Sequence, residues 1–218
     1  MLPAANIIRA ETDVERRLHD QFGTSRADWI AVAHAAVLAR NDATLFDPSN
    51  AAGQLAYIYG TRAVRGLLVP KGYEVSRQDN VEATYSRDRQ LKVIYQNVDW
   101  ASDTTRSPKA ISGKGPASGR IIEQSAGFLF PEMEAEAQAA LHERLTLEAS
   151  QTWYFAVSAD GDDVRAELSR PYPIVDAQFN GFAERIFILE PGDWSEFASL
   201  DFDDGDSGQH FEINVTRK

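Results

Sequence analysis

A loop rich in glycine, serine, proline and positive charge, residues 107–120, has the composition of a ligand-binding segment. Glycines let backbone N–H groups approach a ligand closely, and Lys109, Lys114 and Arg120 supply charge for phosphate. The spacing differs from that of a Walker loop, because glycine follows Lys114 where Ser or Thr is required. Loops of this length without structure of their own are more often functional or disordered than simple connectors. We predict an anion-binding loop; the alternative is a surface loop that is basic by chance.

Two arginines form a second candidate for phosphate binding. Arg62 and Arg65 lie three residues apart in a segment with helical periodicity, so they share a face, with Tyr59 one turn earlier. Two guanidinium groups on one face can bind a phosphate bidentately. The alternative is that both arginines pair with acidic residues of the C-terminal half or lie over the core.

A third set of residues lies on a predicted hairpin. Asp79 followed by Gln90-Leu91-Lys92 resembles the pattern of restriction-type metal-dependent nucleases, which place an Asp on one strand and Glu- or Gln-x-Lys on the next. In such enzymes the carboxylates hold Mg²⁺ and the lysine places or deprotonates the attacking water. The order differs here, since the apolar residues of the strand follow Lys92 instead of preceding it. The alternative is a solvent-facing hairpin with mixed charges, which would contain the same residue types.

The resemblance implies a catalytic and metal-binding set on this hairpin. Asp79 and Glu82 are the candidate Mg²⁺ ligands, and Glu82, Lys92, Gln96 and Asp99 are the candidate catalytic residues. The four histidines show no zinc-binding spacing, and the chain has no Cys. The sequence therefore favours neither a zinc site nor thiol chemistry.

Charge is distributed unevenly along the chain, whose net charge is −11. Residues 61–120 contain 11 Lys and Arg against 6 Asp and Glu, whereas residues 121–218 contain 6 against 20. A negative surface repels phosphate, so contact with nucleic acid is expected only at the basic middle segment. The acidic half suits a basic protein partner instead.

The bulk composition is that of a globular protein, with 43% hydrophobic and 10% aromatic residues in 218. The N-terminus lacks the basic start and apolar core of a signal peptide. Apolar runs fall far short of the roughly 20 residues that span a bilayer. Together with the absence of Cys, these features predict a cytoplasmic protein without membrane contact.

The first third of the sequence has helical periodicity. Thr12 and Glu15 fit a capping box that begins a helix ending near Gly23. Ser25 begins a second helix, and Asp47-Pro48 a third that ends around residues 70–72.

Strand patterns dominate from about residue 73, interrupted by one acidic helix that begins at Pro131. Alternating apolar residues predict two hairpins and two further strands, at 81–85 with 91–95, 153–157 with 164–168, 186–189 and 211–215. This order predicts an α+β fold with N-terminal helices, a mainly antiparallel sheet and one further helix. Residues 1–218 form one domain in this interpretation. A boundary near 121–130, dividing a helical, basic part (1–120) from an acidic, β-rich part (121–218), is the alternative.

Two functions follow from these patterns. The first is a protein that binds nucleic acid or a nucleotide phosphate through the basic segment 62–120, with a Mg²⁺-dependent nuclease as its enzymatic form. The alternative is a non-enzymatic acidic protein that binds or inhibits a basic, nucleic-acid-binding partner through residues 121–218. The basic loop favours the first, because acidic surfaces are common and often serve only solubility.

Overall fold

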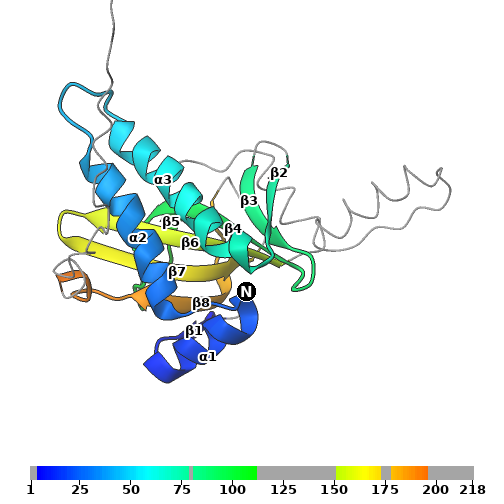
Figure 1. Ribbon diagram of the computed structural model, residues 1–218. Coiled ribbons are helices and arrows are strands. Elements are labelled where there is room, and N and C mark those ends of the chain that lie inside the picture. The colour runs from blue at the N-terminus through cyan, green and yellow to red at the C-terminus, as the bar shows by residue number, and fades with distance from the viewer. Residues whose placement is uncertain (1–3, 79–80, 112–150, 173–177, 196–218) are drawn as a thin grey trace, which may run out of the picture.

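A computed structural model of the chain describes residues 4–78, 81–111, 151–172 and 178–195. Within these ranges, helices cover one face of a mixed sheet, which confirms the α+β class (Figure 1). The helix expected at Pro131, the strand expected at 211–215 and the alternative domain boundary near 121–130 lie outside the described residues.

The helical elements are α1 (Glu11–Phe22), α2 (Arg26–Asn41), α3 (Ala51–Leu68) and the short 3₁₀ helix η1 (Val69–Lys71). The strands are β1 (Asn6–Ile8), β2 (Glu74–Gln78), β3 (Val81–Ser86), β4 (Leu91–Asp99), β5 (Lys109–Ala110), β6 (Gln151–Asp160), β7 (Asp163–Pro171) and β8 (Phe182–Leu189). Both hairpins predicted from alternation are present, as β3–β4 and β6–β7.

Local sequence sets most of the helix ends. Gly23 ends α1 in the left-handed conformation, with φ of 71°. Ser25 caps α2 through a capping box, because its hydroxyl accepts from the Asp28 N–H and the Asp28 carboxylate accepts from the Ser25 N–H. The capping box expected at Thr12 was wrong. The cap of α1 is Ala10, and Glu15 instead accepts from the backbone N–H of Arg26.

The third helix begins at Ala51, four residues after the predicted start at Asp47. The reason is local. The Asp47 carboxylate accepts from the backbone N–H and the hydroxyl of Thr44, both at 2.8 Å, and so closes a turn between α2 and α3.

The strand order is β1-β8-β7-β6-β4-β3-β2, with β5 beside β4. The prediction of a mainly antiparallel sheet needs correction, because β4 pairs with β6 and β1 pairs with β8 in parallel. Parallel neighbours need a connection of a dozen residues or more, and residues 100–150 provide that length between β4 and β6. The same sheet contains strands from before and after position 121.

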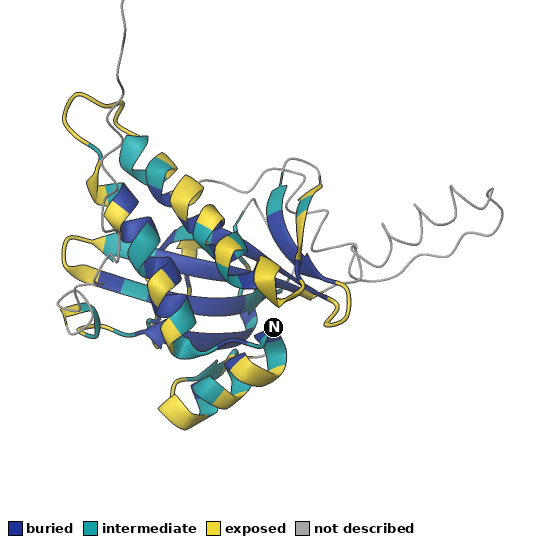
Figure 2. Cartoon of the chain, viewed as in Figure 1, coloured by how far each residue is buried: buried dark blue, intermediate teal, exposed yellow. Residues whose placement is uncertain are grey.

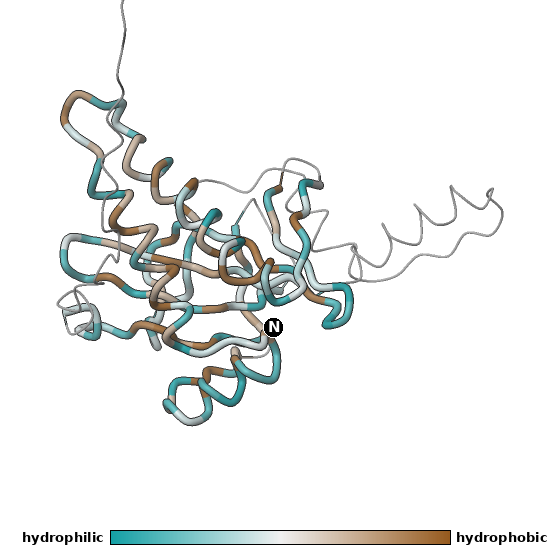
Figure 3. Tube along the Cα trace, viewed as in Figure 1, coloured by the Kyte–Doolittle hydropathy of each residue, from teal (hydrophilic) through white to brown (hydrophobic). Residues whose placement is uncertain are grey.

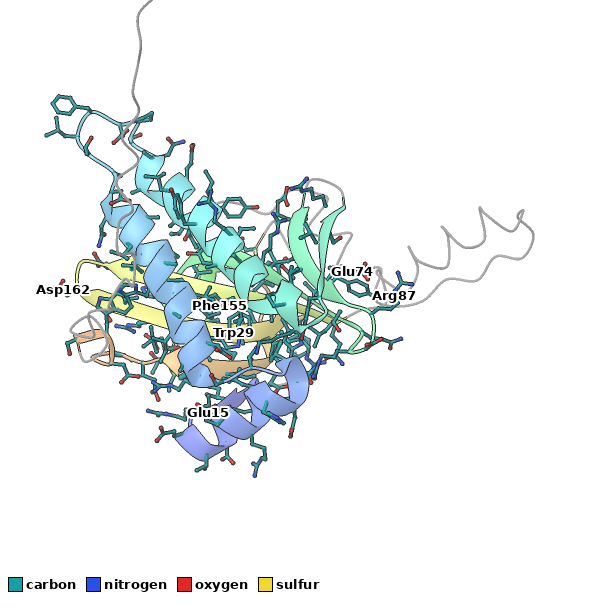
Figure 4. The ribbon with its side chains drawn as sticks, in the orientation of Figure 1. Glu15, Trp29, Glu74, Arg87, Phe155 and Asp162 are labelled. Carbon is teal, nitrogen blue, oxygen red and sulfur yellow. The ribbon has the colours of Figure 1, made fainter. Side chains whose placement is uncertain are left out.

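The main core lies between the helices and the sheet. Trp29 of α2 packs on Phe155 of β6, with ring centroids 4.9 Å apart. Figure 4 labels both residues. Trp153 and Phe155 face the helices, whereas Tyr154 faces the opposite side of the sheet and packs edge-on against Phe179 at 5.0 Å. All three consecutive aromatics are buried, so both faces of β6 are covered (Figure 2). No helix in the described ranges is long and apolar enough to cross a membrane.

Candidate functional site

A cavity of about 430 Å³ lies where the parallel strands β4 and β6 end side by side. The ends of these two strands line it, together with the last turns of α2 and the start of β7. Ligand sites of α/β sheets favour the carboxyl ends of parallel strands. The charged residues that line the cavity are Arg40, Asp99, Asp103, Arg106, Asp160, Asp163 and Arg165.

The turn after β4 forms one wall of this cavity and has an unusual backbone. Trp100 and Ser102 have positive φ angles of 60° and 48°, a region that bulky residues adopt only when the surroundings enforce it. Here hydrogen bonds enforce it. The Ala101 N–H donates to the Ser158 hydroxyl at 3.3 Å, and the Ser102 hydroxyl donates to the carbonyl of Ala166 at 2.7 Å.

A buried ion pair fixes the rest of this turn. Glu167 and Arg185 are 0% and 3% exposed and form a bidentate pair, with N–O distances of 2.8 and 2.6 Å. Glu167 also accepts from the Ser102 N–H at 2.5 Å, and Arg185 Nη1 donates to the carbonyls of Asp103 and Arg106. The pair therefore positions the backbone that carries the side chains of the cavity wall.

Trp100 and Arg106 form an exposed aromatic–cation pair on this wall. The Arg106 guanidinium lies 5.1 Å from the centre of the Trp100 ring, and Trp100 is 43% exposed. An exposed indole beside a guanidinium group offers a flat surface for stacking and a positive charge next to it.

Two carboxylates of the cavity, Asp103 in the turn after β4 and Asp163 of β7, stay ionised at neutral pH. Hydrogen bonds from Thr105 hold the pKa of Asp103 below its ordinary value. The hydrogen bond from Arg165 lowers the pKa of Asp163 and raises that of Arg165. Arg165 Nη2 lies 2.5 Å from Asp163 and Arg165 Nη1 lies 3.7 Å from Asp103, so one cation links both acids.

Three further charged groups of the cavity have no such pairing. In the part of the chain that the structure describes, no hydrogen bond or ion pair occupies the side chains of Arg40, Asp99 or Asp160. Arg40 is half-buried at the end of α2, and both aspartates are exposed at the ends of their strands. A buried or half-buried cation without a partner is favourable only with an anion or water beside it.

The arginines predicted on α3 lie outside this cavity. Arg62 is exposed, with its guanidinium 4.5 Å from the centre of the Tyr59 ring. Arg65 pairs with Glu82 of β3, which also accepts from Arg77 at 3.3 Å. These arginines therefore do not present two free guanidinium groups to one phosphate. The expected acidic partner exists for Arg65, but on β3 rather than in the C-terminal half.

The nuclease-like residues do not meet in one place either. Glu82 faces α3, whereas Lys92 points to the opposite face of the sheet and is 3% exposed. Successive side chains of a strand alternate between faces, so Gln96 shares the face of Lys92, and its amide donates to the Asn97 carbonyl. Of the predicted catalytic set, only Asp99 lines the cavity.

The predicted metal site has no counterpart in the described residues. They contain no group of three or more His, Asp or Glu placed to hold a metal ion. Asp79 lies outside the described residues, and the carboxylate of Glu82 is held by two arginines, which compete with a cation.

The basic loop is described only up to residue 111. Lys109 is exposed in β5, in register with Asp99. Lys114 and Arg120 lie outside the described residues, so the predicted anion-binding loop stays a prediction.

Of the charged residues and the tryptophan that line the cavity, sequence reasoning predicted only Asp99. It missed Arg40, Trp100, Asp103, Arg106, Asp160, Asp163 and Arg165. One signal pointed to three of them, because Trp100 directly follows the last residue of a strand, and Asp103 and Arg106 lie in the non-periodic segment behind it. Arg40 and Arg165 gave no signal, since each reaches the cavity through the packing of its own helix or strand.

The chain matches no protein-family model, no curated protein and no solved structure.

Proposed function

We propose that the chain binds a small phosphorylated ligand of the nucleotide class in the cavity at the ends of β4 and β6. The observation that carries the proposal is that an exposed indole, Trp100, and three guanidinium groups, those of Arg40, Arg106 and Arg165, line the same cavity. An indole ring stacks on a nucleobase, and guanidinium groups bind phosphate oxygens. The volume of about 430 Å³ lies within the usual range of small-molecule sites, roughly 300–1,000 Å³.

The acids of the cavity favour a nucleotide over a nucleic-acid strand. Asp99 and Asp160 are acceptors without hydrogen-bond partners in the described part of the chain, and they suit sugar hydroxyl or base amino groups. Four aspartates against three arginines repel a polyanion. A small ligand can place its phosphate beside Arg40 and Arg106, which form no ion pair with an aspartate within the described residues, whereas Arg165 is held by Asp163 and Asp103. A nuclease gains no support, because Glu82 and Lys92 lie on opposite faces of the sheet.

The alternative function stays a prediction. It places a basic protein partner on residues 121–218, and the most acidic segment, 201–206, lies outside the described residues. The cytoplasmic location likewise remains a proposal, which the absence of Cys and a nucleotide ligand both fit.

Isothermal titration calorimetry with adenosine and guanosine mono- and diphosphates tests the proposal. We expect binding by the wild type and a loss of affinity of about tenfold or more in Arg106→Ala, since a charge-assisted hydrogen bond contributes about 1.5–3 kcal/mol. Arg62→Ala is the matched control, because Arg62 lies over Tyr59 in a similar aromatic–cation pair outside the cavity. The proposal is wrong if no nucleotide binds at millimolar concentration, or if both variants lose affinity equally.

A further inference from the structure

Exposed apolar side chains concentrate on the hairpin formed by α2 and α3. Most of the large hydrophobic residues that are exposed in the described ranges lie between positions 38 and 69. They are Leu38, Leu45, Phe46, Tyr57, Ile58, Tyr59 and Val69. Figure 2 shows the connection between α2 and α3 as exposed, and Figure 3 shows apolar residues at that same connection. Large exposed apolar side chains gathered on one hairpin indicate an interaction site.

The tip of the hairpin is a defined turn that presents two apolar side chains to solvent. Leu45 and Phe46 are 87% and 91% exposed. The residues on either side of this pair close the turn, because the Asp47 carboxylate accepts from the N–H and the hydroxyl of Thr44. The Thr44 hydroxyl also accepts from the Phe46 N–H at 3.3 Å. The hydrogen bonds from Thr44 lower the pKa of Asp47, so the turn persists at neutral pH. These hydrogen bonds therefore hold the backbone of the turn in place, although exposure of the apolar side chains of Leu45 and Phe46 to water is unfavourable.

The two ends of the hairpin carry opposite charge. Asp42 and Asp47 are exposed at the tip. Arg62 and Lys71 are exposed toward the other end, where α3 runs into η1. A surface that is acidic at one end and basic at the other is complementary to a copy of itself turned by a half rotation.

We propose that two copies of the chain pair through the outer face of the α2–α3 hairpin, in antiparallel orientation about a two-fold axis. Leu45 and Phe46 of each copy then pack on the exposed face of α3 around Tyr59 and Val69 of the other copy. The acidic tip of each hairpin lies near Arg62 and Lys71 of its mate. The pairing is independent of the nucleotide proposed for the cavity.

The available area agrees with this pairing. Because a large aromatic side chain buries about 150–250 Å² when fully covered, the seven exposed side chains present roughly 600–700 Å² per copy. A standard interface buries about 800 Å² per partner, and its polar rim supplies the remainder. A two-fold interface contains each contact twice, so both hairpin tips and both α3 faces contribute to it.

Sedimentation velocity of the full chain between about 1 and 200 μM tests the pairing. We expect a wild-type dimer and a monomer for the double variant Leu45→Asp, Phe46→Asp over the same range. Val75→Asp is the matched control, since Val75 is 48% exposed on β2 outside the hairpin, and this variant should dimerise like the wild type. Arg62→Glu should raise the dissociation constant about tenfold, because it places a like charge opposite the acidic tip.

Thermal unfolding followed by circular dichroism checks that the variants fold. Leu45 and Phe46 are almost fully exposed, so the double variant should unfold at the wild-type temperature when both are compared below the dimer dissociation constant. A wild type that stays monomeric throughout the range overturns the proposal and leaves the surface to a different protein. A double variant that dimerises like the wild type also overturns it.

Discussion

At the scale of single residues, the buried pair Glu167–Arg185 decides whether the cavity wall forms. Glu167 accepts from the Ser102 N–H, and Arg185 donates to the carbonyls of Asp103 and Arg106. Two apolar side chains in their place could not form these hydrogen bonds. Glu167→Ala should lower the free energy of unfolding by about 3–5 kcal/mol, because it leaves a buried guanidinium group without its carboxylate.

Urea unfolding of this variant has a direct control in Asp163→Ala. Asp163 forms a similar ion pair with Arg165 but is 44% exposed, so its loss should change the free energy of unfolding by about 1 kcal/mol or less. Equal losses in both variants would show that burial does not govern the strength of these pairs.

Glu82 makes the free energy of unfolding depend on pH in the acidic range. The hydrogen bond from Arg65 lowers the pKa of Glu82 below its ordinary value of 4.5. A carboxyl group with a lowered pKa stabilises the folded state above pH 4.5 and loses that contribution as the pH falls through the folded-state pKa. Because the side chain is 34% exposed, the contribution should be about 1 kcal/mol or less.

Glu82→Gln tests this dependence by urea unfolding at pH 7 and pH 3. The variant should be less stable than the wild type at pH 7, and this difference should shrink as the pH falls, because protonation of Glu82 in the wild type removes the charge that pairs with Arg65. A difference that stays constant across this pH range would contradict the ion pair with Arg65.

At the scale of elements, α3 packs on β4 at a position where only glycine fits. A Cβ atom at Gly60 would overlap the ring of Tyr95, whereas one at Gly66 in the same helix would meet nothing within 4 Å. Gly60→Ala should therefore destabilise the fold by about 1–3 kcal/mol. Gly66→Ala should stabilise it by about 0.5–1 kcal/mol, since alanine loses less backbone entropy in a helix.

Thermal denaturation of the two variants compares these effects within one helix. The same sign for both changes would contradict the close contact of α3 with β4. Tyr95 and Asn97 also link this contact to the cavity, because the Tyr95 hydroxyl donates to Asn97 and the Asn97 amide donates to the Gly53 carbonyl.

Local signals in the sequence were sufficient for most elements. Ser25 and Gly23 mark helix ends, and period-two alternation marks both hairpins. The parallel pairing of β4 with β6 had no local signal, because it depends on contacts across more than fifty residues. The strand β1 is only three residues long and shows no periodicity to detect.

Most of the cavity could not be predicted from the sequence either, because its residues come together through contacts between distant parts of the chain. The sequence predicted Asp99 as a catalytic residue, but in one site with Glu82 and Lys92. The pleat sends Lys92 to the opposite face of the sheet, and packing brings Arg40 and Arg165 from a helix and from another strand instead. Residue types near Asp99 in sequence therefore did not reveal its neighbours in space.

At the scale of the whole molecule, the net charge of −11 favours a small ligand over a polyanion at the proposed site. Electrostatic repulsion should keep a long polyanion from the cavity while a small ligand enters. Fluorescence anisotropy with labelled 20-mer DNA and RNA at low salt should show affinity no higher than that for a mononucleotide. Tight binding with a steep salt dependence would instead place a nucleic-acid surface on the basic segment 62–120.

The most direct measurement is an NMR titration of the tryptophan indole N–H signals with adenosine diphosphate. Trp29 and Trp153 are fully buried, whereas Trp100 is 43% exposed at the cavity, and Trp100→Phe assigns its signal. The account predicts a saturable shift of the Trp100 signal, with the signals of Trp29 and Trp153 unchanged. A Trp100 signal that stays in place up to millimolar nucleotide, or one that shifts no more than those of the buried indoles, would contradict it.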